Sequence, residues 1–352
     1  MSYHFFSDHE FAGPGPMDLI TFWNRTPRQL RQKPRTTIAQ YHFPNSSEFG
    51  IPEKALVADA LEIATLWNSY YTGPDWKFLC SYKDVERWMN DGFILILRET
   101  VNKRKVIVAT FVCHILPDGV YCGAHISQAG LLDGLVIIPR LRKKGLASYM
   151  LVAMDKEVYT MPSMSQSILV WFREHSNSVN SFSQIPIAVL DYVYIKIEDI
   201  PTQSIVATVA DPIIVKQAVN SIFEISKHDF TILSPNSADP DIYWFQVNSS
   251  IVGIADTHRV SNNGYMLWEV IFAANLQKPN FENLQNMIEI SALSLPSKKG
   301  IIFASNSKSR GNLTIVNKPW TSGTSGCLSM HVYNWMPPSF LTGDILFSHT
   351  YI

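Results

Sequence analysis

The sequence lacks the short motifs that would assign it at once to a common enzyme class. No Walker A loop, HExxH helix or GxSxG elbow occurs in it. Its four cysteines, Cys80, Cys113, Cys122 and Cys327, form no CxxC pair, so neither a zinc site nor a disulfide framework is indicated. In a reducing compartment such scattered thiols are usually buried small apolar residues. We therefore expect no metal ion in this protein.

Charge and long apolar runs are also scarce. Charged residues make up 17% of the chain and the formal net charge is -1, whereas a dedicated nucleic-acid-binding domain is normally basic. No apolar run is long enough to span a bilayer, and the first residues mix histidine and acids with aromatics, unlike a signal peptide. We therefore expect a cytoplasmic protein with no nucleic-acid partner and no transmembrane segment. Its 352 residues and 46% hydrophobic content suffice for two domains or one large one.

The segment 131–158 organises the rest of the chain. Its first eight residues are a short, mostly apolar run that ends before Pro139, which predicts a buried strand over 131–138. A glycine inside such a run, here Gly134, is typical of a β-bulge or of a ligand lying against the backbone. Apolar residues between Ala147 and Val158 then recur at helical spacing. The segment is thus predicted to be a strand, a glycine-containing turn and a helix.

The turn Arg142-Lys143-Lys144-Gly145-Leu146-Ala147 has a possible chemical use. The free N–H groups and the dipole at a helix N-terminus favour an anion such as a pyrophosphate. The pattern Arg-x-x-Gly-x-Ala after a strand resembles the acyl-CoA-binding motif of the GCN5-related N-acetyltransferase (GNAT) superfamily. The alternative is an ordinary helix N-terminus with solvated lysines.

Residues 1–50 are expected to form an extended arm. Prolines alternate with basic residues after Phe22 and Trp23, which disfavours a helix. The positive charge of this arm suits the phosphates of coenzyme A, or else nucleic acid or an acidic protein surface, and it could also be solvated without any ligand.

The order of the predicted elements gives the fold class. After the arm we expect helices over 52–68 and 81–90, strands over 93–98 and 106–115 joined by a loop over 99–105, a turn at 117–119, the segment 131–158, and strands over 167–172 and 188–197. Beyond residue 200 the order repeats, with helices over 212–226 and 283–295 and strands over 242–247, 251–257, 265–272, 301–304 and 328–333. The second half has no counterpart of the turn over 142–147, which we call the phosphate turn. We predict an α/β fold with mixed sheets, built from two tandem acyl-CoA N-acyltransferase (GNAT-like) folds in residues 51–198 and 199–352.

A tandem of this kind, with one phosphate turn, resembles the eukaryotic N-myristoyltransferases. The stretches that carry the resemblance follow the order of that family along the chain. They are Phe22-Trp23-x-x-x-Pro27, Asn68-x-x-Tyr71-x-x-x-Asp75, Leu141-Arg142-x-Lys144-x-x-Ala147, Lys299-Gly300, and Tyr333-Asn334-Trp335 with Pro338-Ser339.

The resemblance implies roles for particular positions. The backbone amides of Gly134 and Leu135 would form an oxyanion hole for the thioester carbonyl, and the C-terminal carboxylate of Ile352 would deprotonate the N-terminal glycine of a substrate peptide. The amine would then attack the acyl-CoA thioester directly. The residues that would hold the coenzyme are Phe22, Trp23, Arg142, Lys143, Lys144, Gly145, Leu146 and Ala147.

The sequence departs from that family near the chemistry. Its Glu-Ile-Asn-Phe-Leu-Cys segment is Leu-Leu-Asp-Gly-Leu-Val over 131–136, and the tail is about three residues longer. Asp133 offers another base for the amine proton, or else a structural carboxylate bonded to a neighbouring backbone amide. His125 could be a base, or a core or loop histidine.

Several further residues allow two interpretations. The aromatics Trp67, Tyr70, Tyr71 and Trp76 could wall an acyl or peptide groove, or form core. The stretch 321–326, rich in serine and glycine, could approach a ligand or form a surface turn.

Three hypotheses of function follow. The first is an N-acyltransferase that moves myristate from myristoyl-CoA to the N-terminal glycine of proteins. The second is a binding or structural protein that keeps the double fold without turnover. The third is an acetyltransferase that uses acetyl-CoA.

Overall fold

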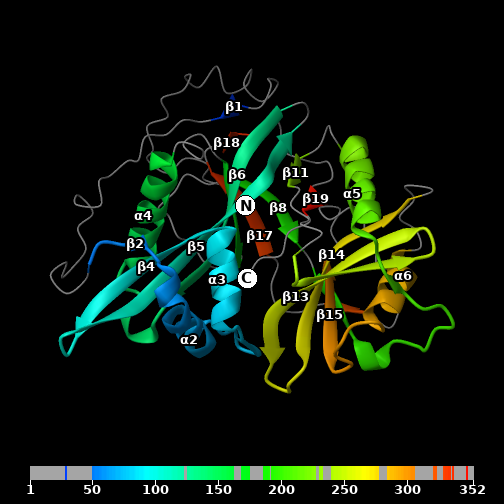
Figure 1. The fold of residues 1–352 in the computed structure, drawn as a ribbon, viewed down its shortest axis with the longest axis horizontal. Coiled ribbons are helices and arrows are strands. Elements are labelled where there is room, and N and C mark those ends of the chain that lie inside the picture. The colour runs from blue at the N-terminus through cyan, green and yellow to red at the C-terminus, as the bar shows by residue number, and fades with distance from the viewer. Residues whose placement is uncertain are drawn as a thin grey trace, which may run out of the picture.

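The computed structural model has two β-sheets that lie side by side, each with helices packed on it (Figure 1). It describes residues 28–29, 50–122, 125–161, 168–174, 185–190, 192–226, 230–232, 239–276, 284–305, 320–322, 328–333, 335–336 and 346–347, and for some of these, such as 116–122 and 125–128, only the backbone path. Within this part of the chain, no helix combines the length and hydropathy needed to cross a lipid bilayer.

The first sheet has nine strands among the described residues, in the order β19-β11-β5-β6-β7-β17-β8, with β4 beside β5 and β2 beside β4. Their bounds are β2 Glu53–Lys54, β4 Gly92–Val101, β5 Arg104–Cys122, β6 His125–Ile137, β7 Ile168–Glu174, β8 Ile185–Leu190, β11 Phe230–Ile232, β17 Leu328–Tyr333 and β19 Leu346–Phe347. The inner pair β6 and β7 is parallel, as the predicted strand, turn and helix over 131–158 requires.

Helices cover both faces of the first sheet. On one face α2 (Ala60–Tyr70) and α3 (Tyr82–Asn90) bury Trp67 and Trp88 against apolar strand residues. On the other face α4 (Leu146–Thr160) buries Met150 and Met154. The 3-10 turns η2 (Val57–Asp59) and η3 (Pro139–Leu141) precede α2 and α4. Because the alternating faces of each strand meet a different helix layer, the strands are apolar on both sides.

The second sheet has eight strands in the order β10-β12-β13-β14-β15-β9-β16, with β3 beside β13. Their bounds are β3 Trp76–Phe78, β9 Tyr192–Lys196, β10 Thr208–Val209, β12 Ile242–Val247, β13 Ser250–Ser261, β14 Met266–Asn275, β15 Gly300–Ser305 and β16 Thr321–Ser322. Helices α5 (Pro212–Ser226) and α6 (Leu284–Ala292) pack on opposite faces of it. The turn η4 (Ile197–Asp199) follows β9, and β1 (Arg28–Gln29) pairs with β18 (Trp335–Met336) apart from both sheets.

The two halves of the chain exchange strands. The loop after α2 sends β3 to the edge of β13 in the second sheet, and β17, late in the chain, returns to the first sheet between β7 and β8. The chain passes from the first sheet to the second between Leu190 and Tyr192. The boundaries drawn from the sequence at residues 50 and 198 remain predictions.

Most predicted elements are present, and four need correction. The single strand expected over 188–197 is two strands, β8 and β9, in different sheets, because one alternating pattern cannot show that a strand ends midway. The first helix begins at Ala60 and not at 52, since η2 precedes it. The expected loop over 99–105 is a tight hairpin turn, with Asn102 and Lys103 both at positive φ. The turn expected at 117–119 is an irregularity inside β5.

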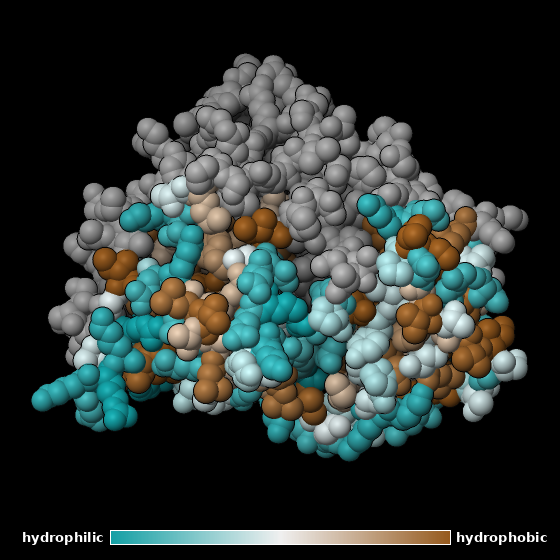
Figure 2. All heavy atoms as spheres, viewed as in Figure 1, coloured by the Kyte–Doolittle hydropathy of each residue, from teal (hydrophilic) through white to brown (hydrophobic). Residues whose placement is uncertain are grey.

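On the face that Figure 2 shows, the described hydrophobic residues form separate small patches among hydrophilic ones. The exposed apolar residues fall mainly in two sequence groups, one at Ile51, Leu56, Val57 and Leu61, the other at Ile205, Val206, Val209 and Ile213. Small separated patches are normal for a globular protein.

Candidate acyl-CoA site

The site expected from the sequence lies where β6 is irregular. In the register between β5 and β6, Thr110 faces Val136 and Val112 faces Asp133, so Gly134 and Leu135 stand opposite Phe111 alone. Two residues against one define a β-bulge. Gly134 has φ +57°, and a Cβ placed there would lie 2.7 Å from Val112 Cγ2. Glycine is therefore required at this position both by backbone conformation and by space.

The same strand separates from its parallel neighbour just before the bulge. Pairing between β6 and β7 runs from Ala129 and Ile168 to Leu132 and Trp171. Beyond that point β6 continues to Ile137 and β7 to Glu174 without pairing with each other. The bulge therefore faces a divergence between two parallel strands, a place where a ligand can reach backbone groups.

Asp133 makes the backbone contact that one of its two sequence interpretations describes. Its Oδ1 accepts a hydrogen bond of 2.6 Å from the Gly134 amide and lies 3.4 Å from the Tyr71 hydroxyl. The amide of Gly134, one of the two expected oxyanion donors, is thus already bonded to a carboxylate. Leu135 is the remaining candidate donor of that pair.

The turn before α4 has the backbone shape expected of an anion-binding loop. Lys143 and Gly145 have φ of +64° and +82°, and Gly145 is the N-cap of α4 without any side-chain capping bond. In the part of the chain that the structure describes, no atom lies within 4 Å of a Cβ placed at Gly145. The N–H groups of Leu146 and Ala147 open this helix and, together with left-handed residues just before it, favour a negative charge.

The arginines near this turn are engaged in structural contacts. The guanidinium of Arg142 donates to Ile137 O at 2.9 Å and to Tyr70 O at 3.1 Å, which ties the end of β6 to the end of α2. Arg140 forms an ion pair with Glu99, and its hydrogen bond lowers the pKa of that carboxyl. The exposed side chains of Lys143 and Lys144 are therefore the better candidates for phosphate contact.

The aromatic residues separate into core and surface. Trp67 is fully buried and packs on Phe78 and Trp88, so its core interpretation applies. Tyr71 and Trp76 are half-buried, whereas Tyr70 is exposed. The amide of Asn68 in the family-like stretch clamps the chain at Cys80 through hydrogen bonds of 2.8 and 2.9 Å.

Some predicted site residues lie outside the described part of the chain. These are Phe22, Trp23, Ile352 and the stretch 323–326; His125 is described only as backbone in β6. Among the cysteines, Cys80 and Cys113 are free thiols, and burial raises the pKa of each to about 12. Neither is activated as a nucleophile.

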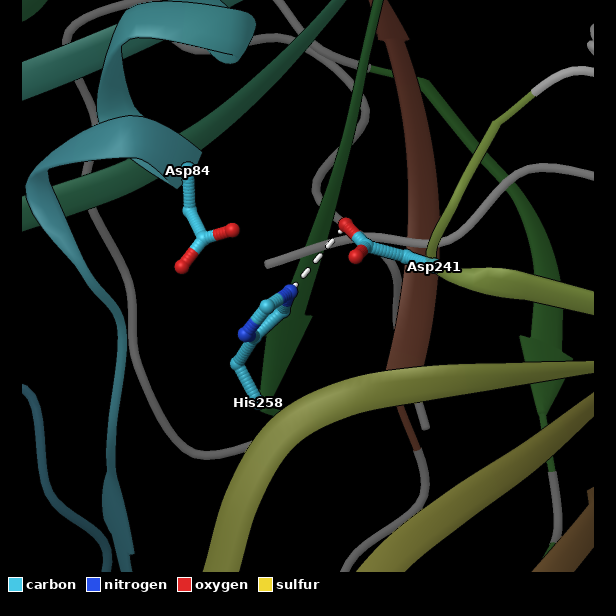
Figure 3. A group of neighbouring side chains, drawn as sticks. All are labelled: Asp84, Asp241 and His258. Atoms are coloured by element: carbon cyan, nitrogen blue, oxygen red, sulfur yellow. Dashed lines mark ion pairs between the residues drawn. The ribbon is translucent and has the colours of Figure 1, made fainter. Parts of the chain in front are cut away.

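A charged cluster that the sequence did not indicate joins the two halves. Figure 3 shows Asp84, from α3, facing His258 and Asp241 from the second sheet, with an ion pair of 3.0 Å between His258 Nε2 and Asp241 Oδ2. Arg87 also pairs with Asp241. Residues more than 150 positions apart in the sequence meet here, such as Arg87 and Asp241, which are 154 positions apart, and no sequence motif or spacing predicts such a contact.

Asp84, Asp241 and His258 each offer one atom that could bind a metal ion, and these atoms lie within 4.8 Å of one another. The contacts of the cluster are nevertheless those of an ion-pair network. Arg87 already places a cation on Asp241, and Asp84 completes the capping box of α3 with Ser81. Burial opposes the charged imidazolium of His258, but its ion pair with Asp241 and the nearby negative charges of Asp256 and Asp84 outweigh this effect and raise its pKa.

A surface hollow of about 480 Å³ lies on the second half of the molecule, where Tyr265, Lys298 and Lys299 are among its lining residues. None of the lining residues belongs to β6 or α4, so this hollow is separate from the bulge and the phosphate turn.

The fold and the site together define the class of protein. Both halves have an inner parallel strand pair and helices on both sheet faces, which is the mixed α/β, tandem GNAT-like architecture expected from the sequence. No protein-family model and no curated protein match this sequence.

Solved structures give the particular fold. A crystal structure of Saccharomyces cerevisiae N-myristoyltransferase with bound myristoyl-CoA aligns with a TM-score of 0.63 and 10% identity, over 89% of this chain and 90% of that one. A second structure of the yeast enzyme, with bound myristoyl-CoA and inhibitors, aligns with a TM-score of 0.63 and 11% identity, over 91% and 87%. This chain therefore has a divergent N-myristoyltransferase-like fold, and the predicted fold class is confirmed.

Proposed function

We propose that this protein is an acyl-CoA-dependent N-acyltransferase that transfers myristate to the N-terminal glycine of proteins. One observation carries the proposal: the uncapped N-terminus of α4 follows directly on a strand that carries a glycine bulge beside a diverging parallel neighbour. The amides at the start of α4 and the bulge beside the end of the β6–β7 pairing thus belong to one continuous segment of the chain. The yeast structures of the same fold contain myristoyl-CoA, which supports this choice of co-substrate.

The reaction needs few groups from the protein. The substrate ammonium loses a proton, its nitrogen attacks the thioester carbonyl carbon, and the C–N bond forms as the C–S bond breaks with its electron pair on sulfur. The products are an amide and the coenzyme A thiol, with one proton released. In this proposal the amides of Lys143 to Ala147 hold the pyrophosphate, and the amide of Leu135 stabilises the oxyanion.

The proton acceptor is proposed to be a carboxylate, either that of Asp133 or the C-terminal one of Ile352. Asp133 lies at the bulge itself, next to the proposed oxyanion donor. Phe22 and Trp23 are proposed to contact the coenzyme, as the family resemblance implies. Substitution of Asp133 by Asn, compared with removal of the last residue, separates the two bases: the variant that loses turnover while it keeps acyl-CoA binding identifies the acceptor.

Calorimetric titration with acetyl-, octanoyl-, myristoyl- and palmitoyl-CoA tests the proposal, together with mass spectrometry of a glycine-initiated peptide. We expect tightest binding of myristoyl-CoA and a peptide mass increased by one myristoyl group. A peptide that begins with acetylated glycine is the control, since it has no amine to acylate. Preference for acetyl-CoA would contradict the acyl group proposed here, and no binding of any acyl-CoA would contradict the enzyme altogether.

A further inference from the structure

A buried hydrogen-bond relay reaches the bulge from the far side of the first sheet. The indole Nε1 of Trp67 donates to Thr110 Oγ1 at 2.7 Å, and Thr110 Oγ1 donates to the carbonyl oxygen of Gly134 at 3.1 Å. Trp67 and Thr110 are both fully buried. The relay links helix α2, strand β5 and strand β6.

The direction of the relay is fixed by chemistry. An indole N–H can only donate, so the Thr110 hydroxyl must accept from Trp67 and its single hydrogen is left for Gly134 O. Each bond polarises the next in such a chain, which strengthens the bond to the carbonyl. The peptide unit between Gly134 and Leu135 is therefore held by its oxygen.

A held oxygen also fixes the amide of the next residue. In a planar trans peptide the C=O and N–H bonds point in opposite directions. The oxygen of Gly134 points toward Thr110 on β5, so the N–H of Leu135 points away from β5, to the side where pairing between β6 and β7 has ended. That side is where the thioester carbonyl would lie.

We infer that Thr110 and Trp67 are positioning residues, which orient and polarise the Leu135 amide as the oxyanion donor for acyl transfer. The inference rests on the proposed function. The bulge calls for such a support, because the regular pairing of β6 with β5 is interrupted at Gly134 and Leu135, which share the single opposite residue Phe111. The Asp133 carboxylate fixes the preceding peptide through the Gly134 amide, so successive peptides are each held from one side.

The test removes the hydroxyl of Thr110 and keeps the shape of its side chain. In Thr110→Val the relay is broken, and we expect kcat to fall about tenfold or more, since loss of a full oxyanion donor costs about a hundredfold or more. The Kd for myristoyl-CoA should stay within about twofold, since the phosphate turn is untouched. Thr110→Ser retains a hydroxyl and should recover most of kcat.

The second half of the chain offers a matched control. Thr257 is a buried threonine on β13 whose Oγ1 donates to Leu267 O at 2.6 Å, also across an antiparallel strand pair. Thr257→Val removes the same kind of bond, so a comparable loss of stability is expected, with kcat unchanged. If Thr110→Val does not fold, Trp67→Phe breaks the first bond of the relay and should lower kcat about threefold.

Isotope-edited infrared spectroscopy reads the oxyanion donor directly. The carbonyl stretch of bound myristoyl-CoA, labelled with carbon-13 at the thioester, should move to lower frequency in the wild type and lose most of that shift in Thr110→Val. Wild-type kcat and carbonyl frequency in Thr110→Val would overturn this inference alone, as would an equal kcat loss in Thr257→Val. A wild-type protein that acylates no peptide would overturn the proposed function, and this inference with it.

Discussion

The two inner strands of the molecule, β6 in the first sheet and β14 in the second, share one backbone design. Each pairs in parallel with the next strand for four residues and then separates from it, after Leu132 in β6 and after Glu269 in β14. Each also has a bulge two residues further on, at Gly134 and at Ile271. The backbone irregularity is thus a property of the repeated fold.

The side chains at the two bulges differ. The bulge of β6 is surrounded by hydrogen-bonding groups from Asp133 and Thr110 and has a glycine at positive φ. The bulge of β14 carries Ile271, which is buried in an apolar cluster under α5 with Trp244 and Phe272. The backbone of the second bulge is therefore embedded in apolar side chains, where a charged intermediate would be poorly solvated.

The sequences that follow the two strands also differ. After β6 the chain has basic residues and Gly145 at the N-cap of α4. After β14 the sequence Leu276-Gln277-Lys278-Pro279 contains neither a glycine nor a basic cluster. One fold thus occurs twice, and the groups that the proposed chemistry needs are found at the first bulge, since function depends on the groups at a site and not on the fold.

The largest effect that separates the two bulges is expected at the glycine. In Gly134→Ala the new Cβ would lie 2.7 Å from Val112 Cγ2 and 3.3 Å from Trp67 Cζ2, at a φ of +57°. Left-handed strain and overpacking together should lower the free energy of unfolding by about 3 kcal/mol. Ile271→Val at the second bulge should cost about 1 kcal/mol. Urea unfolding of both variants makes the comparison, and equal costs would mean that the two bulges are alike.

Gly145→Asp tests the anion site with a smaller expected effect. A carboxylate beside the uncapped amides of α4 should weaken myristoyl-CoA binding about a hundredfold, or about 2.7 kcal/mol. Gly264→Asp is the matched control, because Gly264 also has positive φ, +77°, in a turn of the second half. Calorimetry should find wild-type affinity in the control. Weakened binding in both variants would count against a site in the first half.

The contact between the halves is expected to contribute about as much as a single charged hydrogen bond. Asp241→Asn leaves Arg87 and His258 without their shared carboxylate and should lower the free energy of unfolding by about 2 kcal/mol. Asp199→Asn, at an exposed position, should change it by less than about 0.5 kcal/mol. Chemical denaturation measures both, and an unaffected Asp241→Asn would show that the network does not fasten the halves.

The smallest effect should be a pH dependence at the same contact. Because the pKa of His258 is raised in the folded state, its ion pair stabilises the protein fully below the ordinary histidine pKa of about 6.5. This stabilisation is lost as pH rises through the higher folded value. The urea midpoint of the wild type should therefore fall more than that of His258→Gln between about pH 6 and pH 8. If the urea midpoints of the two proteins changed equally with pH, His258 would not be the source of the pH dependence.

Local signals in the sequence predicted much of this fold. The helical spacing over 147–158 predicted α4, and a helix was also predicted over 81–90, where α3 has Ser81 as its N-cap, because caps and amphipathic faces are local signals. The exchange of β3 and β17 between the sheets could not be predicted from the sequence, since an alternating pattern indicates a strand but not the strand with which it pairs.

The candidate site was predictable in part for the same reason. Gly134 and Gly145 stood out because glycine marks unusual backbone, and both have positive φ. The relay from Trp67 through Thr110 joins residues 43 and 24 positions apart, and no spacing rule reports such contacts. Asp133 allowed two interpretations in the sequence, and the structure shows the bond to the Gly134 amide.

Hydrogen–deuterium exchange of the two halves with and without myristoyl-CoA tests the central claim most directly. If the first half alone binds the coenzyme, exchange should slow for the amides of 143–147 and of Leu135, while those of 284–292 in α6 are unchanged. Unchanged exchange over 143–147 at saturating myristoyl-CoA, or equal protection in both halves, would contradict it.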